Sequence, residues 1–213
     1  MAESGRGLSI ANYALIMVAL VLLAFLSYGA FTYAEFRRVH ADMAATSRAA
    51  AQEEIRLVMD QLLQEAEAQA DEFAAWEEVG QQLQNPRYYA YWRNRRMMHS
   101  KMLSAYVADA ELYDRQGSAL AILDGRLLPA QVGTPPPPSY VDYSGAEPTL
   151  LVFRTVYGPG DSYRRHPLGY VGLRIRFLQQ MRESRAYRYI DPESISFDRG
   201  AAPSLTWGCL LYT

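Results

Sequence analysis

The feature that most constrains this chain is a charge-free segment near its N-terminus. No Asp, Glu, Lys or Arg occurs from Gly7 to Ala34, and residues 10–30 are almost wholly apolar. As an α-helix these 21 residues span about 31 Å, close to the roughly 30 Å hydrocarbon core of a bilayer. We therefore predict a short N-terminal segment over residues 1–9 and a transmembrane helix over residues 10–34.

Two other interpretations of this segment stay open. One is a cleaved signal peptide, because the small residues Thr32 and Ala34 flank Tyr33 at the end of the segment. The other is a buried core helix. We favour an uncleaved anchor, since the apolar run exceeds the 7–15 residues usual for a signal peptide and only Arg6 precedes it.

Composition narrows the function classes. The 213 residues are 50% hydrophobic and 21% charged, which fits one globular domain with an appendage. The net charge of −2 argues against nucleic acid as a partner. Cys209 is the single cysteine and the three histidines are scattered, so we expect neither a disulfide nor a metal site. No phosphate-binding glycine loop or catalytic constellation is evident, and we expect no cofactor and no enzymatic activity.

Residues 35–84 have the composition of a long helix, without proline and with Gly80 as their one glycine. Between residues 53 and 78 there are nine acidic residues and one basic residue. The helix is either an amphipathic core helix with a solvated acidic face or a dimerising, signalling stalk. One apolar stripe follows a helical period: Ile55, Val58, Leu62, Ala66, Ala70, Phe73, Trp76 and Val79.

Asn85 and Pro86 end this helix, and an aromatic, basic helix is predicted over residues 87–103. Alternating patterns then predict strands over 106–113, 118–123, 149–157 and 170–177, with a turn at 114–117 and a short helix or linker at 178–185. One sheet face is expected to be apolar and to pack on the long helix. The other is expected to carry the charged residues Asp109, Glu111, Arg154, Arg174 and Arg176.

The predicted fold class is therefore α+β, with a transmembrane helix continuing into a long helix packed on a small antiparallel sheet. Over residues 35–180 this order resembles the PAS-like Cache and CHASE sensor domains of bacterial receptors. The resemblance rests on Trp76, the aromatic segment 88–92, the turn from Asp114 to Gly117 and the closing strand 168–176.

The resemblance implies a Cache-like sensor core over residues 85–180 and a linker, or the truncated start of a second membrane segment, over 181–213. It also implies a homodimer formed through the long helix, and an output domain of the GGDEF/EAL cyclic-di-GMP, histidine kinase or chemoreceptor type outside this chain. The expected location is the inner membrane, single-pass, with the sensor in the periplasm. Arg37 and Arg38 oppose that orientation under the positive-inside rule.

The candidate site for a small-molecule ligand combines aromatic walls with charged groups that can bind a carboxylate or an ammonium group. The alternative is that the aromatics pack on the sheet and the charges form internal ion pairs. We expect a membrane-anchored sensor, or alternatively a single-pass envelope protein that acts as a non-sensory interaction scaffold. The candidate ligand-binding residues are Tyr88, Trp92, Arg96, Tyr106, Asp109, Arg154 and Arg174.

Overall fold

A computed structural model describes residues 10–121, 127–158, 166–184, 186–198 and 204–206. The chain divides into two units, residues 1–50 and 51–213. The helices are α1 (Ile10–Ala75), α2 (Glu77–Gln84), η1 (Pro86–Tyr88), α3 (Tyr89–Trp92), the π-helix η2 (Arg93–Met97), α4 (Phe177–Glu183) and η3 (Pro192–Ser194). The strands are β1 (Val107–Tyr113), β2 (Ser139–Asp142), β3 (Thr149–Tyr157), β4 (Pro167–Ile175), β5 (Ser196–Asp198) and β6 (Ser204–Thr206).

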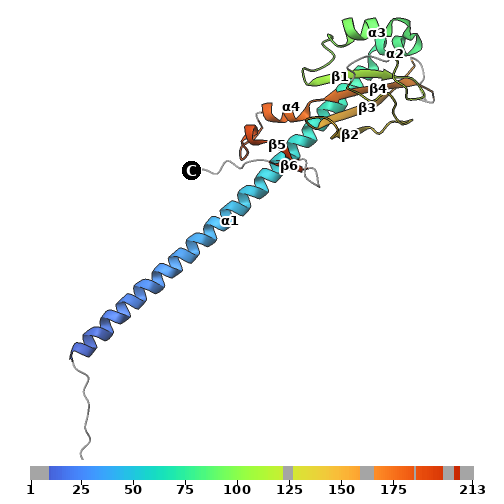
Figure 1. Ribbon diagram of the computed structural model, residues 1–213. Coiled ribbons are helices and arrows are strands. Elements are labelled where there is room, and N and C mark those ends of the chain that lie inside the picture. Colours follow the sequence, from blue (N-terminus) through green and yellow to red (C-terminus); the bar gives the residue numbers. More distant parts are fainter. Residues whose placement is uncertain (1–9, 122–126, 159–165, 185, 199–203, 207–213) are drawn as a thin grey trace, which may run out of the picture. The chain divides into compact units, whose positions relative to one another are not determined.

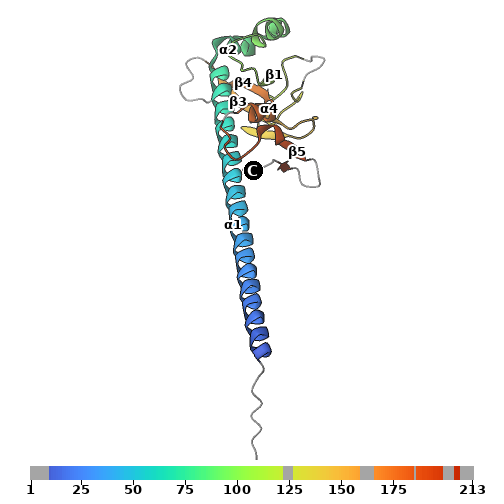
Figure 2. The same cartoon turned by 90° about the vertical axis from the view of Figure 1, so that its left-hand side faces the viewer.

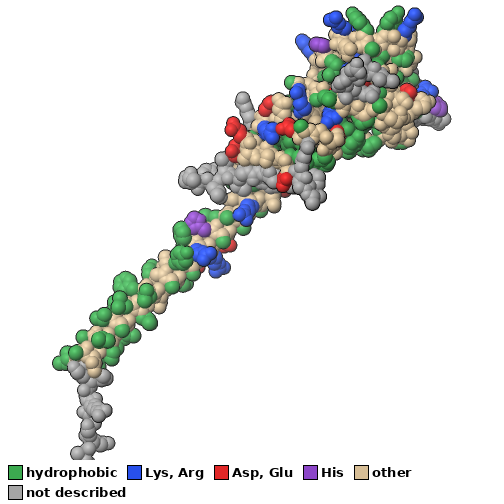
Figure 3. All heavy atoms as spheres, in the orientation of Figure 1, with side chains coloured by type: hydrophobic (Ala, Val, Ile, Leu, Met, Phe, Trp, Pro, Cys, Tyr) green, Lys and Arg blue, Asp and Glu red, His purple; other side chains and the backbone are tan. Residues whose placement is uncertain are grey.

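The first unit contains the N-terminal part of α1. None of its described residues is buried, and hydrophobic side chains predominate at the N-terminal end of the helix in Figure 3. The hydroxyls of Ser27 and Thr32 donate to carbonyls four residues earlier, each at 2.8 Å, so they are satisfied within the helix. The segment is long and apolar enough to cross a membrane, a property that it shares with signal sequences.

In the second unit, α1 buries the predicted apolar stripe from Ile55 to Phe73. The prediction of one continuous helix to residue 84 is wrong, because α1 ends at Ala75 and α2 begins at Glu77. Trp76 between them is extended, with φ −66° and ψ 123°. Its ring packs between those of Phe73 and Trp92, at centroid distances of 5.9 and 5.3 Å.

The predicted basic helix over residues 87–103 is shorter and less regular than expected. It consists of η1, α3 and the π-helix η2, and it ends at Met97. Tyr89 and Trp92 are buried, and so is Arg93 in the first position of the π-helix. The wider turn allows the Arg93 guanidinium to reach carboxylates on β1, a contact that local helix propensity does not encode.

Four strands form an antiparallel sheet in the order β1-β4-β3-β2 (Figure 1). Three of the predicted strands correspond to β1, β3 and β4. The predicted strand over 118–123 is wrong for its described part, where only isolated bridges at Ser118 and Ala119 occur; residues 122 and 123 lie outside the described residues. The backbone N–H groups of Ala119 and Val132 instead bond to Ala130 and Gly117.

The turn predicted at 114–117 is confirmed. The Asp114 carboxylate accepts hydrogen bonds from the N–H groups of Gln116 and Ser118, both at 2.9 Å. Gly117 has φ +78°, and a Cβ there would lie 2.4 Å from the carbonyl oxygen of Val132. Only glycine fits this position.

The two faces of the sheet are covered by different parts of the chain. The predicted apolar face packs on α1 from Ala51 onward, and Figure 2 shows this helix along one side of the sheet. The second face, predicted to be polar, also carries an aromatic cluster of Tyr113, Phe153 and Tyr170 around Leu128. The expectation of a purely polar face was incomplete, because the chain around Leu128 packs on part of it. The alternation of residues within single strands does not reveal such a covering segment.

The short helix or linker predicted at 178–185 corresponds to the helix α4, which ends at Glu183. Beyond it, β5 and β6 form a two-stranded antiparallel sheet, in which Phe197 pairs with Leu205. The ring of Phe197 stacks on Tyr143 at 5.3 Å.

Candidate functional site

Buried charges gather where η2 meets β1. Arg93, Asp109 and Glu111 retain 8%, 4% and 0% of their exposure. Asp109 and Glu111 alternate with Ala110 and Leu112 along β1, so both acidic residues lie on the face opposite α1. Burying three ionised groups is unfavourable unless they are paired, so the partners of each group decide what the cluster can do.

Arg93 is the centre of this cluster. Its guanidinium donates to the Asp109 carboxylate and, at 3.1 Å, to the carbonyl of Ala110. Its Nε also lies 3.4 Å from Oε2 of Glu111. One cation therefore serves two carboxylates, and its placement depends on the π-helix η2. Such π-turns occur frequently at functional sites.

Glu111 is hydrogen-bonded to the side chain of Tyr89. The Tyr89 hydroxyl donates to Glu111 and accepts the N–H of Leu112 at 3.0 Å. Burial raises the pKa of Glu111 above 4.5, although Tyr89 and Arg93 act in the opposite direction. Burial and then the Glu111 charge raise the pKa of Tyr89 well above 10, so the phenol remains the hydrogen-bond donor.

The charged contacts continue across the sheet from β1 to β4 and β2. The second carboxylate oxygen of Asp109 accepts the N–H of Leu127 at 2.9 Å, and the Leu127 carbonyl accepts from Arg174. Arg174 also lies 3.2 Å from Asp142. Burial acts to raise the pKa of Asp142, but hydrogen bonds from Ser144 and the Arg174 charge bring it below 3.8.

Some of the predicted ligand-binding residues do come together. Asp109 and Arg174 are direct register partners on β1 and β4, and both bind Leu127. Trp92 and Arg96 share one partner, Glu78 of α2. The indole N–H of Trp92 lies 2.7 Å from the Glu78 carboxylate, and the Arg96 guanidinium lies 2.5 Å from it. These residues form two separate clusters, and in each cluster the side chains contact partners from the chain itself.

The other three predicted residues lie elsewhere. Tyr88 is exposed, with the Arg87 guanidinium 5.7 Å from its ring centre. The Tyr106 hydroxyl donates to Glu183 at 2.7 Å. The structure thus does not bring the seven residues into one site, and ligand binding by them stays a prediction.

The expectation that Arg154 lies on the polar sheet face is wrong. Arg154 pairs in register with Val171 on the face that packs on α1, and its guanidinium lies 2.8 Å from Asp71 and 3.3 Å from Glu67 of that helix. Residues 150–153 are apolar on both faces, so this strand showed no alternation by which to place Arg154.

The residues that complete these clusters were not among the predicted site residues. They are Glu78, Tyr89, Arg93 and Asp142, whereas Glu111 was expected on the charged sheet face and lies there. The available signal was the pair of acidic residues inside a seven-residue strand whose other members are apolar or aromatic. A buried acidic pair requires a cation nearby, but the sequence offers several arginines and does not say which one reaches it.

Within the described residues, no group of three or more His, Cys, Asp or Glu side chains is arranged to hold a metal ion. No protein-family model, curated protein or solved structure matches the chain.

Proposed function

We propose that this chain is a membrane-anchored sensor protein. Its apolar N-terminal segment spans the bacterial inner membrane, and the α+β unit is a PAS-like input domain that binds a small ligand in the periplasm. The observation that carries the proposal is that one helix, α1, contains both the apolar segment and the core stripe of the sensor unit.

The anchor is supported by exposure. From Ile10 to Phe36 the large hydrophobic side chains remain exposed, with Ile10 at 88% and Phe25 and Leu26 at 72%. Leaving so much apolar surface in water is unfavourable, and a lipid environment removes that penalty. The alternative that this segment is a buried core helix has no support in the described residues.

Signal transmission is supported by the packing of α1 in the second unit. Ligand binding that favours one packing of this helix over another can shift a two-state equilibrium of the helix. We further propose that two copies associate through the long helix and that an output domain reads the shift. The proposal assigns no catalytic step to the chain.

A topology experiment tests the anchor. Alkaline phosphatase, which is active only in the periplasm, is fused to the C-terminus of the full chain. Membrane fractions are then washed with alkaline carbonate, which removes proteins that are not embedded in the bilayer. We expect an active, carbonate-resistant fusion. Val18→Arg with Leu22→Arg is expected to abolish retention, because each charge at the bilayer centre costs about 2.5–3.5 kcal/mol.

The matched control is Leu57→Arg with Gln61→Arg, which places two arginines at the same spacing on α1 outside the apolar segment. This variant should remain in the membrane. A carbonate-soluble but active wild-type fusion would identify a cleaved signal sequence, and an inactive fusion retained in the membrane would reverse the proposed orientation.

The scaffold alternative is favoured by one observation. Tyr88 and Tyr91 are 68% and 71% exposed, beside the exposed side chains of Arg87 and Arg95. Exposed tyrosine and arginine side chains are frequent in protein interfaces. In-cell crosslinking from position 91 that captures a different membrane protein, together with no ligand response, would favour the scaffold over the sensor.

A further inference from the structure

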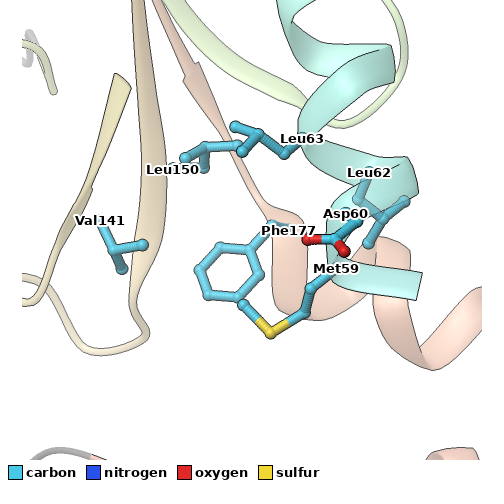
Figure 4. A pocket seen from close by; sticks show the side chains of 7 residues that line it. All are labelled: Met59, Asp60, Leu62, Leu63, Val141, Leu150 and Phe177. Atoms are coloured by element: carbon cyan, nitrogen blue, oxygen red, sulfur yellow. The ribbon is translucent and has the colours of Figure 1, made fainter. Parts of the chain in front are cut away.

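A cavity of about 140 Å³ lies between α1 and the β2 edge of the sheet (Figure 4). Three structural layers contribute to its wall: the helix α1, the strands β2 and β3, and the helix α4. Its lining residues are Met59, Asp60, Leu62, Leu63, Val141, Leu150 and Phe177.

The cavity lies beside the short edge strand β2. β2 has four residues, and its contribution to the α1-facing side of the cavity is Val141, which pairs in register with Leu150. Leu150 and Phe177 are 7% and 6% exposed, while Met59 and Leu63 are half-buried. The cavity is partly open to solvent, and six of its seven lining side chains are apolar.

We propose that this cavity is the ligand site of the sensor, and that it takes a small neutral hydrocarbon group of about six carbon atoms. An apolar cavity of similar volume, about 150 Å³, in another protein binds benzene, which indicates the size of ligand expected here. Asp60 is the one charged lining residue, and its carboxylate lies 3.2 Å from Arg56. Its negative charge disfavours anionic ligands.

A ligand here touches the helix and the sheet at once. Met59 and Leu63 belong to α1, whereas Val141 and Leu150 belong to the sheet, so an occupant changes the packing between these two layers. The biological role of the cavity rests on the proposed sensor function. Its occupancy does not, because binding is measurable whatever the orientation of the anchor.

The test uses the full chain in lipid nanodiscs, with ¹³C-labelled methionine methyl groups and benzene as the probe. Met59 lines the cavity, and Met97 is fully buried in η2 away from it. The Met59 signal is assigned with Met59→Leu. We expect a saturable shift of the Met59 methyl on addition of benzene, because of the ring current of the bound molecule, with no shift of Met97.

Two matched substitutions separate binding from partitioning into lipid. Leu63→Phe fills the cavity and should abolish the saturable shift, and Val141→Phe repeats the test from the sheet if that variant does not fold. Leu57→Phe makes the same change at an exposed position of α1 and should preserve the shift.

A Met59 signal that is unmoved, or that moves linearly and equally in wild type and the filled variants, would overturn the cavity proposal. If the Met59 shift is saturable but the wild-type chain is not retained in the membrane in the topology experiment, the cavity is supported and the sensor anchor is rejected. The two failures are therefore distinguishable.

Discussion

At the scale of single residues, the arrangement around Arg93 brings three buried charged side chains into contact. One guanidinium contacts Asp109 and Glu111, and all three side chains are buried. Removing one member of such a cluster leaves the others as uncompensated charges in a medium of low polarity. The stability of the second unit should depend strongly on this arginine.

Arg93→Met should lower the free energy of unfolding by about 3–5 kcal/mol, because Asp109 and Glu111 lose their cation. Arg95→Met, an exposed position of the same π-helix, should change it by less than about 0.5 kcal/mol. Tryptophan fluorescence during denaturation of the full chain in nanodiscs measures both. Equal midpoints for the two variants would contradict the assignment of Arg93 as the central cation.

Glu111 should make stability depend on pH. Because burial raises its pKa above 4.5, the native state binds more protons than the unfolded state between the two pKa values. The contribution of Glu111 to the free energy of unfolding is therefore fully present below about 4.5 and lost as the pH rises through the native pKa.

The measurement is the difference between wild type and Glu111→Gln across this pH range. The difference cancels the contributions of groups whose pKa is shifted in the opposite direction. Asp142 and Glu183 are such groups, because their pKa values are lowered. Wild-type stability should fall relative to the variant as the pH rises. Parallel curves would show that Glu111 does not titrate differently in the two states.

At the scale of elements, glycine has opposite roles in a helix and in the sheet. Gly80 lies inside α2, where an added Cβ would meet one side-chain atom at 3.9 Å. At Gly172 in β4 a Cβ would lie 2.8 Å from the Phe153 ring and 3.0 Å from the Tyr113 ring. The helix tolerates a side chain, whereas the aromatic cluster on the second sheet face excludes one.

Gly80→Ala should raise the free energy of unfolding by about 0.5–1 kcal/mol, because alanine is the better helix former. Gly172→Ala should lower it by about 1–3 kcal/mol through overpacking against Tyr113 and Phe153. Thermal denaturation of the two variants in parallel tests the pair. A destabilised Gly80→Ala, or a neutral Gly172→Ala, would contradict the packing described for that element.

At the scale of the whole molecule, the core belongs to one unit. All buried residues among those described occur at or after Ala51, and the described residues of the first unit are exposed or half-buried. Residues 51–213 should therefore fold without residues 1–50.

A fragment of residues 51–213 should be obtained without detergent and should unfold cooperatively, with a Tm within a few degrees of that of the full chain. Circular dichroism and calorimetry provide the measurement. A fragment that is molten or insoluble would show that residues before Ala51 stabilise the core, and would contradict the division into two units.

Much of the fold follows from local patterns. The apolar segment, the stripe from Ile55 to Phe73 and the Asp114–Gly117 turn depend on spacing within a few residues, and the structure has all three. The break at Trp76 was not predictable from helix propensity. The ring of Trp76 packs on that of Trp92, a residue outside this helix, and local propensity does not encode that contact.

The sequence by itself determined the apolar N-terminal segment, the helical stripe of α1 and the strands β1, β3 and β4, because helical and strand periods are properties of neighbouring residues. The tertiary structure alone decided which charges meet. Arg154 reaches acidic residues of α1, whereas Arg174 turns to Asp142 on the other sheet face. Either arginine can pair with any carboxylate in its reach, so the choice depends on how the helix, the sheet and the covering chain pack together.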